Sequence, residues 1–346
     1  MIAGSPIPAI FLLLILALIS AGCGKKDSTE KTFCYNEPNG IESLDPITCN
    51  NYPALHVLIN TCEGLVEYDK EAKLQPLLAK DYTVSEDGKT YTFNLRTDVY
   101  FHDDKCFPEG KGRKVTAKDF KYCYERVCDT RGKTYGLWVF RDKVAGAEEF
   151  AAAPEKVKEI TGFNAVNDST FVIKLVQPFA PFLSILTMPY GYVYPKEAVE
   201  MYKEDFGFRI VGTGPYRFVK WDVDKELFCA KNEKYWGRDK AGNVLPKIDG
   251  FRVTFTRSPE TEFLDFQAGK LDFVKPSIDV FGMITNEDGR LKPEYDFELV
   301  KQPYLNTVYL GIMLNPKTEG GKDNQLSENK KLRQALNYAI DREKIV

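Results

Sequence analysis

The hydrophobic pattern begins with ten unbroken apolar residues, Ile10 to Ile19, followed by Ser20-Ala21-Gly22-Cys23 and then by polar residues. A membrane-spanning helix needs about 20 apolar residues, whereas about ten are typical of the core of a secretory signal. The small residues before Cys23 indicate cleavage by a lipoprotein signal peptidase, so we expect Cys23 to be lipidated. No Lys or Arg precedes the apolar run and Ser20 replaces the usual aliphatic residue, so an uncleaved or non-lipidated leader is the alternative. The polar residues 24–31 then predict a flexible tether.

Alternating apolar positions predict two stretches of β-structure. Tyr82 to Val84 and the alternating Tyr91, Phe93 and Leu95 flank the sequence Ser85-Glu86-Asp87-Gly88. Because Asp-Gly favours a tight turn, this segment predicts a hairpin. A further strand is predicted where Phe171, Ile173 and Leu175 alternate before Gln177-Pro178.

Capping residues followed by apolar positions at helical spacing predict three helices. Thr116 with Asp119 opens the first, whose apolar face carries Phe120, Cys123 and Val127 and is interpreted as packing. Ser258 before Pro259 opens the second, which we expect to end at Gly269. Ser327 is predicted to open the last helix, with one apolar stripe made by Leu332, Ala335, Leu336, Ala339 and Ile340.

Composition indicates an ordered body with more than one lobe. Removal of residues 1–23 would leave 323 of the 346 residues, more than one hydrophobic core usually organises. Hydrophobic residues make up 43% of the chain and aromatic residues 13%, and the strand and helix patterns alternate irregularly, so we expect a mixed α/β fold. The net charge of −3 and the lack of a long basic run argue against nucleic acid as a partner. The short cluster of Lys111, Arg113 and Lys114 is interpreted as a solvated loop.

Seven cysteines remain when Cys23 is set aside: Cys34, Cys49, Cys62, Cys106, Cys123, Cys128 and Cys229. In an oxidising compartment they could form up to three disulfides, but the sequence does not give their pairing. Cys123 and Cys128 fall on one predicted helix at a spacing that a disulfide does not bridge. With no CxxC and only two histidines, a zinc site of familiar spacing is not expected.

The sequence carries none of the common catalytic signatures: there is no GxSxG, HExxH, phosphate loop or dinucleotide-binding GxGxxG. Gly212-Thr213-Gly214-Pro215 is interpreted as a tight turn where two backbones pass closely. The pairs Asp103-Asp104 and Glu148-Glu149 are interpreted as surface carboxylates. His102 beside Asp103 could act as a base, but a structural role is the simpler interpretation. We therefore expect a protein that is not an enzyme and needs no cofactor.

Several segments, in order, resemble one family: the extracellular solute-binding proteins of family 5, the oligopeptide- and dipeptide-binding receptors of ABC importers. The resemblance covers nearly the whole chain after the leader, and Cys62 and Tyr82 replace the Tyr and Trp common in the family. The matching segments are Ser43-Leu44-Asp45-Pro46, Cys62-Glu63-Gly64-Leu65-Val66, Leu77-Leu78-Ala79, Tyr82 to Gly88, Thr90 to Arg96, Phe101-His102, Thr116 to Phe120, Gly212 to Tyr216, Asn232 with Tyr235-Trp236, Ala268 to Asp272, and Leu332 to Arg342.

The resemblance implies a two-lobed periplasmic-binding-protein-like clamp with an extra N-terminal subdomain. Transferred to this chain, lobe I takes residues 32–64 and 175–302, the inserted subdomain takes 65–174, and an incomplete lobe II starts at 303. The alternating residues 306–315 are expected to form a strand that crosses between the lobes. In the family, the acidic residue that receives the peptide α-amino group follows the last matching segment, so we expect this chain to be truncated, to bind poorly and to fold incompletely.

The resemblance also implies a function and candidate ligand residues. The protein would be a monomeric substrate-binding component of an ABC transporter, lipid-anchored on the periplasmic side of the cell envelope, which captures oligopeptides or dipeptides and delivers them to a permease. Alternatives are a non-peptide ligand such as a nickel chelate, heme or sugar, a signal-sensing lipoprotein, and an envelope hydrolase. Tyr216, Tyr235 and Trp236 are assigned to packing. Candidate contacts near the hinge, as backbone hydrogen-bonders or aromatic walls, are Glu63, Tyr68, Tyr190, Tyr304 and Asn306; each tyrosine could equally be a half-buried core residue.

Overall fold

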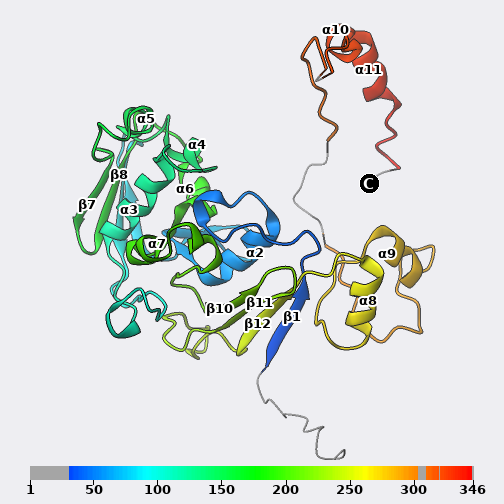
Figure 1. Cartoon of the computed structure of the whole chain (residues 1–346), viewed down its shortest axis with the longest axis horizontal. Helices are drawn as coiled ribbons and strands as arrows, with labels where there is room; N and C mark the ends of the chain where they lie inside the picture. The colour runs from blue at the N-terminus through cyan, green and yellow to red at the C-terminus, as the bar shows by residue number, and fades with distance from the viewer. Residues whose placement is uncertain (1–30, 303–308, 319, 345–346) are drawn as a thin grey trace, which may run out of the picture. The chain divides into compact units, whose positions relative to one another are not determined.

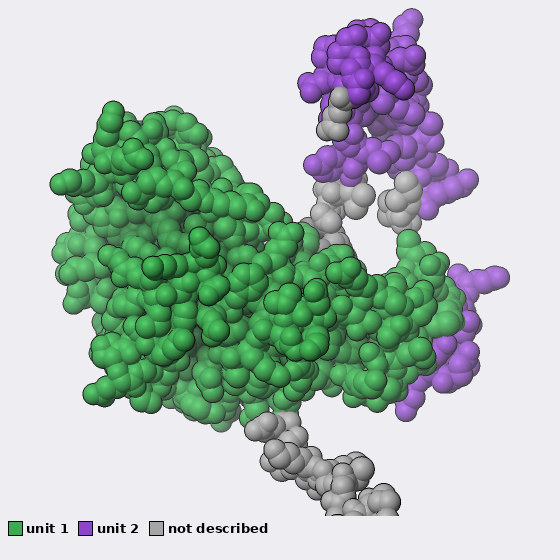
Figure 2. Space-filling model, viewed as in Figure 1, with its two compact units in different colours: residues 1–283 green, residues 284–346 purple. Residues whose placement is uncertain are grey.

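The computed structural model describes residues 31–302, 309–318 and 320–344. The leader, Cys23, Tyr304 and Asn306 lie outside the described residues. The chain divides into two compact units, residues 1–283 and 284–346 (Figure 2). Within the described ranges, none of the helices combines the length and apolar character that a bilayer crossing requires.

The first unit contains two four-stranded sheets (Figure 1). The first sheet has the order β1-β12-β11-β10, with β1 parallel to β12 and the other neighbours antiparallel. Its strands are β1 (Thr32–Asn36), β10 (Tyr216–Asp222), β11 (Glu226–Lys231) and β12 (Gly250–Thr254).

The second sheet is antiparallel with the order β5-β6-β8-β7. Its strands are β5 (Ala79–Val84), β6 (Thr90–Leu95), β7 (Phe163–Asn167) and β8 (Thr170–Lys174). The predicted hairpin is confirmed, because Val84 pairs with Tyr91 and Tyr82 with Phe93. The strand predicted from Phe171 and Ile173 is confirmed as β8.

The first unit also contains two short two-stranded ladders. One pairs β2 (Glu63–Gly64) with β9 (Tyr192–Val193), and the other pairs β3 (Val66–Tyr68) with β4 (Leu74–Pro76). The helices of the first unit are η1 (Pro46–Thr48), α2 (Tyr52–Thr61), η2 (Pro108–Gly110), α3 (Ala117–Cys128), α4 (Leu137–Phe140), α5 (Ala147–Ala152), α6 (Phe182–Ile185), η3 (Pro189–Gly191), α7 (Lys196–Tyr202), η4 (Lys203–Phe208), α8 (Pro259–Gln267) and α9 (Ile278–Ile284), which reaches the boundary of the second unit.

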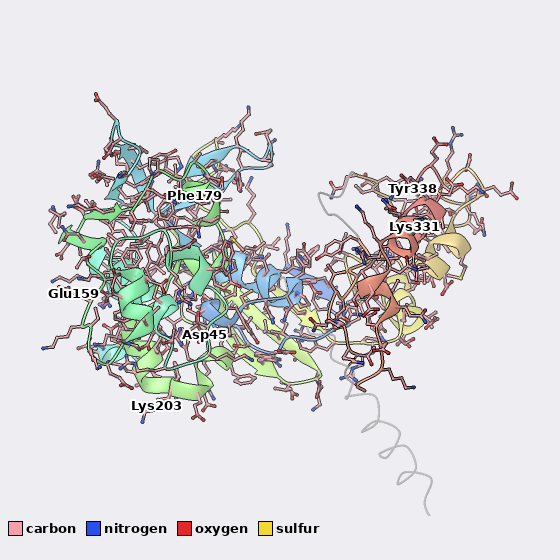
Figure 3. The ribbon with its side chains drawn as sticks, turned by 90° about the horizontal axis from the view of Figure 1, so that it is seen from above. Asp45, Glu159, Phe179, Lys203, Lys331 and Tyr338 are labelled. Atoms are coloured by element: carbon pink, nitrogen blue, oxygen red, sulfur yellow. The ribbon has the colours of Figure 1, made fainter. Side chains whose placement is uncertain are left out.

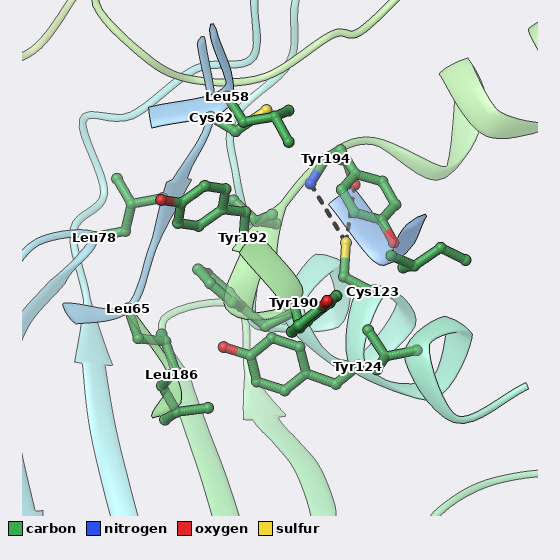
Figure 4. Close-up of a cluster of buried hydrophobic side chains, with 14 of the residues drawn as sticks. Leu58, Cys62, Leu65, Leu78, Cys123, Tyr124, Leu186, Tyr190, Tyr192 and Tyr194 are labelled. Atoms are coloured by element: carbon green, nitrogen blue, oxygen red, sulfur yellow. Dashed lines mark hydrogen bonds between the residues drawn. The ribbon is translucent and has the colours of Figure 1, made fainter. Parts of the chain in front are cut away.

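Helix α3 packs against the second sheet through the face that the sequence predicted. Its capping box is formed as expected, with the Asp119 side chain accepting hydrogen bonds from the Thr116 backbone amide and hydroxyl. Phe120 and Tyr124 contact Phe171 with ring centroids 6.0 and 5.7 Å apart. Cys123 on the same helix accepts a hydrogen bond from the Tyr194 amide at 3.3 Å, in the buried cluster that Figure 4 shows.

A partly buried ion pair connects α3 to the segment before α2. The Arg126 guanidinium on α3 donates to both carboxylate oxygens of Asp45 at 2.7 and 2.6 Å. Asp45, which is labelled in Figure 3, also accepts a hydrogen bond from the amide of Ile47 and so caps η1. The conformation of residues 43–49 is therefore set by contacts from a distant helix.

The structure confirms the predicted bounds of one helix and corrects two expectations about the C-terminal part of the chain. Helix α8 begins after the Ser258 cap and ends before Gly269, whose φ is +70°, as predicted. The last helix does not start at Ser327: α10 (Gln325–Glu328) is capped by Asn324 and α11 (Lys330–Ala339) by Asn329. Residues 309–315 form no strand among the described residues. An extended segment becomes a strand only when a neighbour supplies ladder hydrogen bonds, and no described segment does so here.

The seven described cysteines are free thiols, so the disulfides that an oxidising compartment would allow are not formed. Cys123 and Cys128 do not pair, as expected. Burial raises the pKa of the Cys128 thiol to about 12, so this sulfur stays protonated at neutral pH. These cysteines act as small packing residues. The proposed boundaries between the lobes and the subdomain stay a prediction.

Candidate functional site

The structure places the predicted contact residues in different environments. Glu63 and Tyr190 are buried, whereas 46% of Tyr68 on β3 is exposed. Tyr304 and Asn306 fall outside the described residues. The role of all five as ligand contacts stays a prediction, and burial leaves little of Glu63 or Tyr190 for a ligand to touch.

Glu63 lies on β2, directly after helix α2, and its carboxyl group accepts hydrogen bonds from two aromatic side chains. The donors are the Tyr235 hydroxyl at 2.9 Å and the Trp236 indole nitrogen at 3.3 Å. Burial raises the pKa of Glu63 to about 7, although these hydrogen bonds oppose the shift. The assignment of Tyr235 and Trp236 to packing is thus consistent with their contacts, and both support β2.

Tyr190 lies on η3 and holds together two segments that are distant in sequence. Its hydroxyl donates to the carbonyl of Cys49 at 2.7 Å, just before helix α2. Its ring lies against Gly136 so closely that a side chain there would overlap it. The Trp138 ring meets the Tyr190 ring edge-on, with centroids 6.4 Å apart. Tyr190 is therefore a buried residue that connects the segment before α2 to the segment that carries Gly136 and Trp138.

Helix α2 begins with an exposed aromatic residue. Asn51 caps the helix by accepting a hydrogen bond from the Ala54 amide at 3.0 Å, so that Tyr52 and Pro53 are the first two helical residues. The face with Ala54, Val57 and Leu58 is buried, whereas Tyr52, His56 and Ile59 are exposed at spacings of four and three residues. One face of α2 is thus left to solvent although it carries large apolar groups.

Two further exposed aromatic residues belong to segments that hydrogen bonds connect to the residues before this helix. The amide of Tyr135 donates to the carbonyl of Ile47 at 2.8 Å, which brings the loop before α4 to the segment before α2. Tyr52, Tyr135 and Trp138 are 55%, 38% and 48% exposed. We call these three side chains the aromatic rim. Flat rings with a polar edge can stack on a planar group and also form hydrogen bonds, so the rim is suited to bind an organic ligand.

Cations lie over two rings of the rim. The Lys133 ammonium is 5.0 Å from the centroid of Tyr135, and the Lys143 ammonium is 6.0 Å from that of Trp138. The quadrupole of an aromatic ring attracts a cation over its face, so these contacts favour the observed placement of both ammonium groups. The His56 ring lies 6.2 Å from the Tyr52 ring, and its Nδ1 lies 2.6 Å from the Glu37 carboxylate. The surroundings of the rim therefore carry both charges, as a zwitterionic ligand requires.

The residues that could have supported catalysis are engaged in structure. His102 is buried, and its Nδ1 accepts a hydrogen bond from the Gly212 amide at 3.3 Å. Its Nε2 lies 2.9 Å from the Gly214 carbonyl oxygen. Both contacts together require the neutral ring with its proton on Nε2. Burial lowers the pKa of His102 to about 4. The Gly212 to Pro215 turn is confirmed as a close approach, because a side chain on Gly212 would lie 2.0 Å from the Thr61 carbonyl oxygen. The described residues hold no cluster of three His, Cys, Asp or Glu side chains suited to a metal ion.

Sequence reasoning missed the aromatic rim. Its signals were local and weak: a tyrosine directly after the capping Asn51, and two aromatic residues three apart, at 135 and 138, close to the glycines at 132 and 136. Their exposure depends on the Tyr135 and Tyr190 hydrogen bonds to residues 47–49, which no local pattern reveals.

The first unit combines two four-stranded sheets with helices, which is a mixed α/β architecture. A family model for bacterial extracellular solute-binding proteins, family 5, matches residues 73–346, which is more than half of the chain. The chain therefore belongs to this family, as the sequence motifs predicted, and it has the mixed α/β fold of the periplasmic binding-protein clamps.

Curated relatives and solved structures agree with this assignment. The chain is 31% identical over 307 residues to the glutathione-binding protein GsiB of Pectobacterium atrosepticum, a match that covers 88% of the chain and 51% of GsiB. The substrate-binding domain of an oligopeptide ABC transporter from Bacillus anthracis is 27% identical with a TM-score of 0.70, covering 91% of the chain and 56% of that structure. Haemophilus influenzae OppA in complex with the peptide RPPGFSPFR is 26% identical with a TM-score of 0.60, covering 71% and 46%.

The chain spans about half the length of the curated relatives that it matches. The expectation of a truncated chain is consistent with this coverage. These relatives are solute-binding proteins and not enzymes.

Proposed function

We propose that this protein is the substrate-binding component of an ABC importer and that its ligand is a short peptide held against the aromatic rim. The observation that carries the proposal is the exposure of Tyr52, Tyr135 and Trp138 around the start of α2 in a chain of family 5. Relatives whose names specify glutathione or oligopeptides support the peptide class. A peptide offers both planar amide groups and opposite charges, which match the rings and the charged side chains around them.

The first test is peptide capture by the full-length protein. The protein is mixed with a peptide pool, purified under native conditions, and the retained peptides are identified by mass spectrometry. We expect a defined set of short peptides on the unmodified protein and strong depletion on a variant that combines Tyr52→Ala with Trp138→Ala. A folded protein that retains no peptide would contradict the proposal.

A thermal-shift screen separates the peptide from the alternative ligands. A ligand that binds only the folded protein raises its unfolding temperature, and at a ligand concentration of about 100 Kd the stabilisation is about 2.7 kcal/mol. We expect peptides to raise the melting temperature and a nickel chelate, heme or sugars to leave it unchanged. A shift with one of these alternatives alone would assign the site to that ligand instead.

We further propose that the protein works outside the inner membrane as a lipid-anchored monomer that delivers its ligand to a permease, with lobes divided at residues 64/65, 174/175 and 302/303. The leader and Cys23 motif supports the anchor, since tethering raises the effective concentration at the permease. Metabolic labelling with a radioactive fatty acid should mark the protein, and Cys23→Ala should abolish the label. Labelling that survives this substitution would contradict anchoring at Cys23.

A further inference from the structure

Trp138 of the aromatic rim has a backbone carbonyl that its own helix leaves without a partner. Helix α4 has only four residues, and in the described part of the chain no backbone amide bonds to the Trp138 carbonyl. The Lys143 ammonium donates a hydrogen bond to this carbonyl at 2.8 Å. The last carbonyls of a helix need such donors, and a lysine just beyond the helix can supply one. Lys143 therefore completes the end of α4 at a residue that belongs to the rim.

The same ammonium also lies near two aromatic rings. It is 6.0 Å from the centroid of Trp138 and 5.4 Å from that of Phe179, which lies between β8 and α6 and is labelled in Figure 3. Asp142 accepts a further hydrogen bond from it at 2.6 Å. The side chain of Lys143 is only 15% exposed, whereas that of Asp142 is 72% exposed. Defined contacts thus hold the ammonium at the protein surface, whereas most lysines extend into solvent.

The backbone of Lys143 is itself fixed by hydrogen bonds to two other segments. Its amide donates to the Phe140 carbonyl at 3.0 Å, and its carbonyl accepts from the Val176 amide at 2.8 Å. The next residue, Val144, forms an isolated antiparallel bridge with Leu175, directly after β8. Lys143 is therefore attached to the segment that leaves β8, and its side chain joins that segment to α4.

The Trp138 ring needs such contacts to keep one orientation. Trp138 is 48% exposed, so packing alone leaves its ring space to move. The edge-on contact with the Tyr190 ring, at 6.4 Å, limits this freedom, and the Lys143 ammonium supplies a second contact. A side chain that is ordered before a ligand arrives loses less conformational entropy on binding, so the affinity is higher. Lys143 thus lies where it can decide whether Trp138 is ready to stack on a ligand.

We propose that Lys143 is a positioning residue of the aromatic rim: its ammonium holds Trp138 in the orientation in which the ring meets the ligand, and it does not itself touch the ligand. The effect on ligand binding rests on the proposed function, but the hold on Trp138 can be measured without any ligand. Lys143→Met keeps the length and the apolar part of the side chain and removes both the charge and the hydrogen-bond donors. Lys143→Arg keeps a cation with donors and is the conservative variant.

The hold on Trp138 is tested by ¹⁹F NMR on the full chain labelled with 5-fluorotryptophan. The chain has three tryptophans, and the resonance that disappears in Trp138→Phe belongs to Trp138. We expect Lys143→Met to shift and broaden this resonance, because the ring then samples several orientations, and Lys143→Arg to restore most of its position and width. Lys196→Met is the control, because it removes an ammonium 5.9 Å from the centroid of Tyr122, a ring outside the rim. A Trp138 resonance that Lys143→Met leaves unchanged, or that Lys196→Met changes equally, would overturn the proposal.

The consequence for binding is tested by isothermal titration calorimetry with a synthetic copy of the most abundant peptide recovered in the capture experiment. We expect Lys143→Met to weaken binding by about fivefold and Lys143→Arg to recover most of the loss. In a Trp138→Ala background, Lys143→Met should have no further effect, because Lys143 acts through Trp138. An unchanged affinity, or an equal loss in both backgrounds, would overturn the positioning role. A failed capture would contradict the proposed function, whereas the ¹⁹F result would still decide whether Lys143 holds Trp138.

Discussion

Substitution of Gly136 by alanine tests whether Tyr190 positions the aromatic rim. The new Cβ would lie 2.4 Å from Cδ1 and 2.6 Å from Cγ of Tyr190, closer than non-bonded carbon atoms can approach. The Tyr190 ring has little freedom to move away, because it is buried and its hydroxyl is bonded to the Cys49 carbonyl. Either the ring or the start of helix α4, which carries Trp138, must shift.

The size of the effect follows from two opposing contributions. Overpacking of a well-packed site costs about 1–3 kcal/mol. The backbone of Gly136 has φ −92° and ψ 0°, which alanine adopts without strain. Alanine also restricts the unfolded chain and thereby stabilises the folded state by about 0.4–1 kcal/mol. We therefore expect Gly136→Ala to lower the free energy of unfolding by about 1–2 kcal/mol, the difference between these contributions.

Gly132→Ala is the matched control in the same loop. A side chain at Gly132 would meet no heavy atom within 4 Å, so only the effect on the unfolded chain remains, and we expect a neutral or slightly stabilising result. Urea denaturation of the full chain, followed by far-UV circular dichroism, measures both variants. In a Tyr190→Ala background, Gly136→Ala should lose its cost, because the two residues are coupled through direct contact. Equal stabilities of the Gly136 and Gly132 variants would refute the reasoning.

Three further outcomes are expected. Tyr52→Ala and Trp138→Ala should each weaken peptide binding, measured by isothermal titration calorimetry, by about tenfold, since a stacked aromatic contact contributes about 0.5–1.5 kcal/mol beyond its buried area. The free energy of unfolding should change by less than about 1 kcal/mol. An unchanged affinity would show that the aromatic rim is not part of the binding site. Glu63→Gln should remove a loss of stability between acid and neutral pH, because a raised folded pKa means that the unmodified protein loses stability as the pH rises from about 4.5 to 7, by about 3 kcal/mol. His102→Gln should flatten the acid side, since a folded pKa of about 4 means that stability is lost as the pH falls below about 6.5; thermal unfolding across pH decides both, and profiles parallel to that of the unmodified protein would contradict them.

Elements with local signals could be predicted from the sequence. The β5–β6 hairpin follows from alternation on both sides of Asp87-Gly88, and α3 follows from the Thr116 capping box, because each interaction involves residues close along the chain. The start of the last helices could not be predicted from local signals. Asn324, Ser327 and Asn329 are all good capping residues, and the Ser327 hydroxyl donates to the Asn324 carbonyl instead of capping a helix. Residues 309–315 alternate like a strand, but alternation supplies no pairing partner.

The candidate site could be predicted only in part. A family motif directed attention to Glu63, and the expected place of the hinge directed it to Tyr190; Glu63 directly follows α2, and the Tyr190 hydroxyl is bonded to Cys49 just before α2. Their burial was not predictable, because it depends on Tyr235, Trp236 and Cys49, which come from other parts of the chain. The aromatic rim was missed for the same reason, since contacts far apart in sequence decide which rings stay exposed.

The most direct test of the central claim is photo-crosslinking of a captured peptide that carries a photoreactive group, followed by mass-spectrometric mapping of the modified residues on the full-length protein. If the aromatic rim binds the ligand, crosslinks will concentrate in residues 49–56 and 133–138, and excess unlabelled peptide will suppress them. Competable crosslinks confined to other segments of the first unit, or crosslinks that unlabelled peptide does not suppress, would contradict the claim that this protein binds peptides at the rim.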